Sequence, residues 1–189
     1  VKGSQLNNVI INSLPITTKT LNLKVDGKNL TKVERGTTVQ LCASCNAKDV
    51  TVTFSILKTG ETTPITLTKP SYAGGKYTKD YSFDTIGEYT IYFTATKDGY
   101  TVQSAEKKLT VTKAAIPASA ITAPAANALT YNGNEQALIT AGMTDHGTMQ
   151  YSLTENGTYS QDIPTGTDAG AYTVWYRVIG DANHNDTAP

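Results

Sequence analysis

The stretch DAGAYTVWYRVIGD, residues 168–181, has a counterpart in DTIGEYTIYFTATKDG, residues 84–99. The tyrosines of the two copies, Tyr89 and Tyr172, lie 83 positions apart. In each copy an acidic residue and a glycine precede the tyrosine, and apolar residues alternate with other residues after it. Alternation with a period of two is typical of a strand that buries one face. A motif repeated at this spacing predicts two similar β modules.

The composition of the chain also favours strands over helices. Threonine occupies 32 of the 189 positions, and tyrosine is the commonest aromatic residue, with 11 copies. Both residue types suit pleated, half-exposed surfaces, and threonine is a poor helix former. No segment of ten or more residues has a convincing apolar period of 3.6 residues. The sequence therefore predicts an all-β protein.

Charge is unevenly spread along the chain, although the net charge is zero. Residues 18–113 carry 14 Lys and Arg against 9 Asp and Glu, whereas residues 114–189 carry one against seven. The lysines of the first part are spread over every segment rather than clustered, so we expect no nucleic-acid partner. No apolar run is long enough to cross a bilayer, so we expect no direct insertion into a membrane.

Short alternating segments separated by turn residues divide the chain into modules. VTVTFSI, residues 50–56, is typical of the first module, and the Ala- and Pro-rich stretch at 114–127 breaks the pattern. Strands of this length and spacing predict a β-sandwich. We expect a preceding module's tail or an edge strand at residues 1–17, a first domain at 18–113, a linker and lead-in to the first strand at 114–127, and a second domain at 128–189.

The repeated motif predicts a tyrosine corner in each module, a feature of immunoglobulin-type sandwiches. There the phenol points inward and its hydroxyl bonds to upstream backbone, while the acidic residue bonds the amides of the turn and the glycine adopts a conformation that a side chain would resist. The residues expected in these roles are Asp84, Gly87, Tyr89, Asp168, Gly170 and Tyr172. The fold class predicted from these observations is two tandem immunoglobulin-like β-sandwiches.

The second module lacks room for a closing strand. The last strand expected in the first module, residues 101–112, maps to 184–195, but the sequence stops in NHNDTAP at position 189. We expect the natural polypeptide to continue, because an open edge beside residues 172–178 would be an aggregation hazard. The alternative is that a neighbouring molecule donates the missing strand.

Several phrases of the second module agree in order with a known repeat. From about Ala120 to Asp186, LTYNGNEQALITAG, GTMQYSL and IPTGTDAGAYTVWYRVIGDANHND closely resemble the bacterial MBG-type immunoglobulin-like repeat. The first module resembles a more generic bacterial immunoglobulin-like domain, chiefly in GEYTIYFTA. The resemblance implies extracellular, tandemly repeated modules of bacterial surface proteins, without catalytic residues.

The CASC motif brings Cys42 and Cys45 close in sequence. In an extended strand, residues three apart face opposite sides at about 10 Å, too far for a bond. A disulfide therefore requires a turn at Ala43 and Ser44. Two unpaired thiols are the alternative, and we do not expect redox catalysis, because no βαβ unit surrounds the motif.

Two further sets of residues are candidates for binding. Asp181, Asn183 and Asn185 alternate as in the start of a calcium loop, although the glycine and distal glutamate of that loop are missing. Alternation on the strand turns Trp175 outward, and Tyr92 has the equivalent place in the first module. Exposed aromatic rings of this kind stack on sugars, but they also cover sheet edges.

These observations predict a non-catalytic, structural or adhesive part of a bacterial cell-surface protein, with no cofactor. Its expected partners are neighbouring modules of the same chain and a surface glycan or protein. The alternative function is a carbohydrate-binding or spacer region of a multi-modular secreted enzyme, with Trp175 and Tyr92 as platforms. No catalytic triad, metal cluster or spaced acid pair stands out in the sequence.

Overall fold

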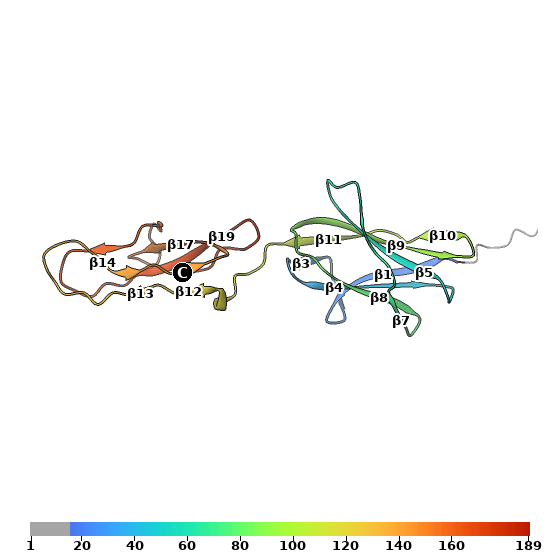
Figure 1. The fold of residues 1–189 in the computed structure, drawn as a ribbon, viewed down its shortest axis with the longest axis horizontal. Coiled ribbons are helices and arrows are strands. Elements are labelled where there is room, and N and C mark those ends of the chain that lie inside the picture. The colour runs from blue at the N-terminus through green and yellow to red at the C-terminus, as the bar shows by residue number, and fades with distance from the viewer. Residues whose placement is uncertain (1–15) are drawn as a thin grey trace, which may run out of the picture. The chain divides into compact units, whose positions relative to one another are not determined.

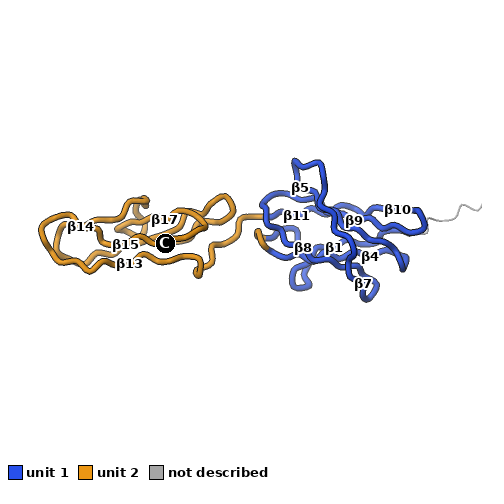
Figure 2. Tube along the Cα trace, in the orientation of Figure 1, with its two compact units in different colours: residues 1–33, 37–111 blue, residues 34–36, 112–189 orange. Residues whose placement is uncertain are grey.

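The computed structural model describes residues 16–189, which form two compact units (Figures 1 and 2). Unit 1 holds residues 16–33 and 37–111, and unit 2 holds residues 34–36 and 112–189. Within this part of the chain the regular elements are β-strands, apart from the 3-10 helix η1 (Ala118–Ala120). The all-β prediction is therefore confirmed. The expectation for residues 1–17 falls almost wholly outside the described residues.

The first sheet of unit 1 has five antiparallel strands in the order β2-β1-β4-β8-β7. The bounds of these strands are β1 (Thr18–Val25), β2 (Lys28–Asn29), β4 (Thr38–Cys45), β7 (Ser71–Ala73) and β8 (Lys76–Ser82).

The second sheet of unit 1 has the order β3-β11-β9-β5-β6, and β10 also pairs with β9. The bounds of its strands are β3 (Lys32–Glu34), β5 (Thr51–Lys58), β6 (Ile65–Leu67), β9 (Gly87–Lys97), β10 (Tyr100–Gln103) and β11 (Lys107–Thr112). The long strand β9 is central, with β5 and β11 as antiparallel neighbours.

The two sheets of unit 1 share one hydrophobic core. In β5 the alternate residues Val52, Phe54 and Ile56 are buried in it, as the sequence pattern predicts. From the other sheet β4 contributes Val39 and Leu41, which have no exposed surface. Each such side chain stabilises the fold by about 1.5–3 kcal/mol relative to leaving it in water. Burial from both sheets therefore holds unit 1 together.

Two Asp-Gly turns close hairpins in unit 1. Asp26 and Gly27 have φ of 49° and 76° between β1 and β2, and Asp98 and Gly99 have φ of 50° and 80° between β9 and β10. Positive φ at both central residues is the hallmark of the type I′ turn, whose twist matches that of the flanking strands. An Asp-Gly pair between two alternating segments is a sequence signature of this turn.

Unit 2 contains four two-stranded antiparallel ladders, which pair β12 with β16, β13 with β15, β14 with β18, and β17 with β19. The bounds of the strands are β12 (Ile121–Thr122), β13 (Ala125–Ala126), β14 (Gln136–Ala137), β15 (Ile139–Thr140), β16 (Met143–Thr144), β17 (Gly147–Ser152), β18 (Thr165–Gly166) and β19 (Trp175–Gly180). The longest ladder runs from the pair Gly147 and Gly180 to the pair Ser152 and Trp175.

A small core holds unit 2 together, made of Leu138, Ile139, Met149, Tyr151 and Val178. Strands β12 and β13 lie within the segment expected to be a linker and a lead-in to the first strand, and they pair with β16 and β15. Residues 121–126 are therefore part of unit 2. Their small side chains do not prevent pairing, because a ladder bonds through backbone groups.

The last residues of the chain fold back along β19. The backbone N–H of Thr187 donates to Val178 O at 2.9 Å, and the Val178 N–H donates to the Thr187 hydroxyl at 2.9 Å. Val178 is opposite Met149 in the ladder with β17, so Thr187 covers the other edge of β19 at that point. Residues 171–174, just before β19, belong to no ladder among the described strands.

Candidate functional site

The Tyr89 side chain of unit 1 is buried at the start of β9. Its hydroxyl donates to the backbone oxygen of Thr85 at 2.7 Å, and its ring meets Phe83 edge-on with centroids 5.0 Å apart. Burial raises the pKa of the Tyr89 phenol, so it stays protonated as a donor. Gly87 has φ of 144°, and Asp84 accepts a bond from the Ser82 hydroxyl at 3.4 Å.

The Tyr172 side chain of unit 2 makes the same backbone bond but is not buried. Its hydroxyl donates to Asp168 O at 3.0 Å, yet the side chain is 42% exposed. The expectation of an inward-pointing ring is therefore wrong for this copy. The ring rests on the bare backbone of Gly166, where an added Cβ would lie 2.7 Å from Cζ of Tyr172. Gly170 is in open space and its φ is not positive, so backbone strain does not require glycine there.

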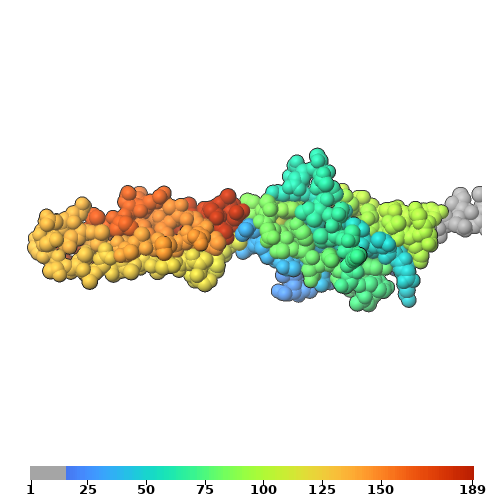
Figure 3. All heavy atoms as spheres, in the orientation of Figure 1, coloured from blue at the N-terminus to red at the C-terminus, as the bar shows by residue number. Residues whose placement is uncertain are grey.

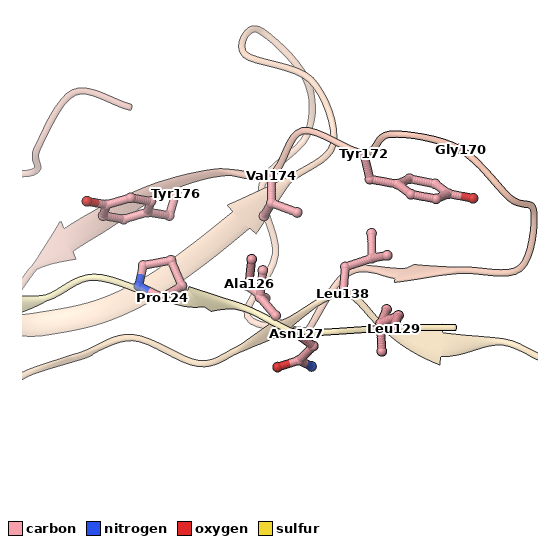
Figure 4. A pocket seen from close by; sticks show the side chains of 10 residues that line it. Pro124, Ala126, Asn127, Leu129, Leu138, Gly170, Tyr172, Val174 and Tyr176 are labelled. Carbon is pink, nitrogen blue, oxygen red and sulfur yellow. The ribbon is translucent and has the colours of Figure 1, made fainter. Parts of the chain in front are cut away.

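An open groove in unit 2 runs beside this exposed tyrosine (Figure 4). It has a volume of about 400 Å³. Its lining comes from residues 124–129, from Leu138 and Ile139, and from residues 170–176. The side chains of Tyr172 and Val174 lie across from Leu138 and Leu129 in the close-up. One side of the groove is thus formed by residues 171–174, the segment just before β19 that joins no ladder.

A smaller hollow of about 230 Å³ continues from the groove around the same tyrosine. Tyr131 and Leu129 line it and are 65% and 44% exposed, and Asp168 and Gln136 add polar groups. Aromatic and apolar side chains with a few polar groups are typical of small-molecule sites. Sequence reasoning missed this site, because Leu129 and Tyr131 lie in an irregular segment without a strand pattern.

The two aromatic residues predicted from the strand pattern are half-buried and lie in different units. Tyr92 is in β9 opposite Ser55, and Trp175 is in β19 opposite Ser152. Next to Trp175 along the strand, Arg177 donates two bonds to the Gln150 side chain and stacks over the Tyr159 ring at 4.5 Å. The most exposed aromatic surface of unit 2 is Tyr131 rather than Trp175.

The two cysteines are free thiols on one continuous strand. β4 extends through Cys45, with Cys42 opposite Asn22 and Ser44 opposite Thr20 in the ladder with β1. The turn that a disulfide needs does not form, so the predicted possibility of a bond between them is wrong. Cys42 is buried, and the half-buried Cys45 thiol donates to Ala47 O at 3.4 Å.

The Asp181 carboxylate contacts the side chain of His184, and not the side chains of Asn183 and Asn185. Oδ1 of Asp181 accepts the Asn183 N–H at 2.7 Å and lies 2.8 Å from Nδ1 of His184. These two bonds lower the pKa of Asp181. The Asn185 amide turns away and donates to Lys113 O. The calcium set expected from the sequence therefore shares only Asp181 with the cluster in the structure, which adds His146 and His184.

In the part of the chain that the structure describes, no helix is long and apolar enough to cross a bilayer. No protein-family model matches the chain, and no curated protein sequence matches it. Among solved structures, the chain is similar to the soluble domain of PmoD from a Methylocystis species. That match has 15% identity and a TM-score of 0.36, and it covers 47% of this chain and 82% of that one.

Proposed function

We propose that the chain is a pair of immunoglobulin-like β-sandwich modules from a bacterial cell-surface protein, with a structural or adhesive role outside the cell and no catalytic activity. The observation that carries the proposal is the Tyr89 corner. A buried phenol at the start of β9 bonds the backbone four residues upstream, between two sheets that share one core. That arrangement is a feature of immunoglobulin-type sandwiches. The MBG-like phrases of unit 2 extend the proposal to the second module.

A structural or spacing role is supported by the way each unit is organised around residues of its own. Each unit has its own hydrophobic core, and each fastens its tyrosine hydroxyl to its own backbone. Exposed loops then offer surfaces for adhesion. The turn between β5 and β6 protrudes from the body of unit 1, and its residues 59–63 are exposed (Figure 3). We propose that a surface glycan or protein binds such loops.

Pulling single molecules of the full chain by its two ends tests the modular role. Two separate unfolding events are expected, each lengthening the chain by up to roughly 260–330 Å at about 3.4 Å per residue. Tyr89→Phe should lower the force of one event only, and Tyr172→Phe serves as the matched variant in the other unit. One smooth extension without two events would refute independent modules. Antibodies against the chain should also label intact cells of its source.

A second candidate function is carbohydrate binding within a multi-modular secreted enzyme, and the groove beside Tyr172 favours it. Exposed aromatic rings next to a carboxylate suit a sugar, whose C–H groups stack on the ring while its hydroxyls bond the acid. A glycan array with the full chain tests this candidate. Binding lost in Tyr172→Ala but kept in Trp175→Ala would locate the sugar in the groove. The reverse result would locate it on the strand face, and no binding would remove this candidate.

A further inference from the structure

Three side chains with metal-binding atoms meet at one end of the ladder between β17 and β19. One nitrogen each of His146 and His184 and one carboxylate oxygen of Asp181 all lie within 4.8 Å of one another. We propose that these residues bind a single divalent transition-metal ion, for which Zn²⁺ is the reference case. The cluster shares no residue with the groove or with the tyrosine corners.

Strand register places the first two ligands side by side. His146 directly precedes β17 and Asp181 directly follows β19, and the end residues of these strands, Gly147 and Gly180, lie opposite each other. The Asp181 N–H donates to His146 O at 3.1 Å. A Cβ at Gly147 would come within 2.1 Å of Ile179 O, so only glycine permits this close approach. The backbone therefore fixes these two positions before any ion binds.

A second backbone contact fixes His184. The Ala114 N–H donates to Asn183 O at 3.0 Å, and the Asn185 N–H donates to Ala114 O at 2.9 Å. These two bonds hold the peptide on each side of His184, and the residue is only 7% exposed. The Lys113 ammonium donates to the backbone oxygen of Asp181 at 2.8 Å. Lys113 therefore binds the backbone of Asp181 and not its carboxylate.

The side chains themselves are already oriented. Nδ1 of His184 lies 2.8 Å from Oδ1 of Asp181, and the Asn183 N–H donates to the same oxygen. The rings of His146 and His184 are inclined by 33°, with centroids 4.2 Å apart. A site whose ligands are held in place by other bonds loses little conformational entropy on binding.

The chemistry of the cluster suits a metal ion, because neutral imidazole nitrogens and a carboxylate oxygen are zinc ligands. Bonds of about 2.0–2.2 Å put the ligand atoms of tetrahedral zinc about 3.3–3.6 Å apart. The three atoms, which lie within 4.8 Å of one another, are then no more than about 1.5 Å from that spacing. Three protein ligands leave the fourth position to water.

Calorimetry on the full chain without an affinity tag, stripped with EDTA and titrated with ZnCl₂, tests the site. We expect saturable binding of one ion per chain. His146→Gln, which removes a half-buried ligand, should weaken the binding by about 100-fold or more, since even outer partners of a metal site contribute 10- to 100-fold. Asp145→Asn is the matched control, because it removes an exposed neighbouring carboxylate outside the cluster and should bind as the wild type does.

Two further measurements keep the result interpretable. Cys45→Ser should keep full affinity, because zinc held by the thiols of unit 1 would lose it. NMR spectra of the wild type should show the ring resonances of both histidines shifting with one equivalent of Zn²⁺, which needs no variant to fold. The proposal is overturned if binding is absent or unsaturable, if His146→Gln leaves it unchanged, or if Cys45→Ser abolishes it.

Discussion

Tyr89 and Phe83 meet edge to face in unit 1, with ring centroids 5.0 Å apart and planes inclined by 74°. The second tyrosine of the repeated motif has the backbone of Gly166 against its ring instead. Tyr89 and Phe83 both belong to the hydrophobic core of unit 1, whereas the Tyr172 side chain is 42% exposed. An aromatic pair stabilises a fold beyond the apolar area that it buries, whereas the glycine against the Tyr172 ring has no ring of its own to pair with it. The same hydrogen bond from a tyrosine hydroxyl is therefore found once in a core and once at the surface. We expect it to contribute differently to the free energy of unfolding of the two units.

Removing the hydroxyls should separate the two corners. Tyr89→Phe removes a part-buried hydrogen bond from a tyrosine ring that is itself buried, and it should lower the free energy of unfolding of unit 1 by about 1 kcal/mol. Tyr172→Phe should cost less than about 0.5 kcal/mol, because water replaces the lost bond at an exposed site. Urea denaturation measures both, with Trp175 fluorescence for unit 2 and backbone hydrogen exchange for unit 1. Equal losses in the two units would contradict the difference in burial.

Two glycines near Tyr172 should respond in opposite ways to alanine. Gly166→Ala places a methyl group against the Tyr172 ring and should destabilise unit 2 by about 1–2 kcal/mol. Gly170→Ala meets nothing within 4 Å and should be neutral or stabilise by up to about 1 kcal/mol, since it restricts the unfolded chain. The midpoint of the Trp175 fluorescence transition in urea reports both. A large loss at Gly170 would show a backbone requirement that the structure lacks.

The two cysteines should behave as independent thiols. In the native protein Cys45 should react with a thiol reagent well before the buried Cys42, and unfolding should expose both. Mass spectrometry after alkylation should show the same two labels with and without prior reduction. A reductant should leave the melting temperature unchanged. One label or none in the unreduced, unfolded protein would instead reveal a disulfide.

Unit 1 should lose stability at alkaline pH. Burial raises the pKa of Tyr77, Tyr81 and Tyr89 above the ordinary value of 10.0. A phenol with a raised pKa keeps its proton longer in the folded state, so the unfolded state ionises first as the pH rises. Stability is then complete below pH 10 and falls as the pH rises through the folded values. Urea midpoints between pH 8 and 11 measure this fall, which Tyr89→Phe should make shallower.

Local patterns in the sequence were enough to predict much of unit 1. VTVTFSI alternates because one face of β5 is buried, and the Asp-Gly pairs turn because they tolerate positive φ. Both signals lie within a few residues of the structure that they predict. The end of β4 at Cys45 could not be predicted in this way, because the strand continues to Cys45 by pairing with β1, which is distant in sequence.

Long-range register explains what the sequence could not predict in unit 2. His146 and His184 lie in loops without periodicity, and they meet only because Gly147 pairs with Gly180. The contact of the Tyr172 ring with Gly166 is likewise long-range in register, because Gly166 lies in β18 and outside the repeated motif. The short strands β12 and β13 carry no alternation of their own, and their partners in β16 and β15 decide that they pair.

Thr85 and Asp168 receive the two tyrosine hydroxyls through their backbone carbonyls. Every amino acid has a backbone carbonyl, so these two hydrogen bonds do not depend on which side chain is present at position 85 or 168. Substitutions at these two positions should therefore change the stability of the fold little. For the same reason, a combinatorial library randomised at positions 85 and 168 should yield mostly folded proteins, which would make the chain a workable scaffold for new loop sequences.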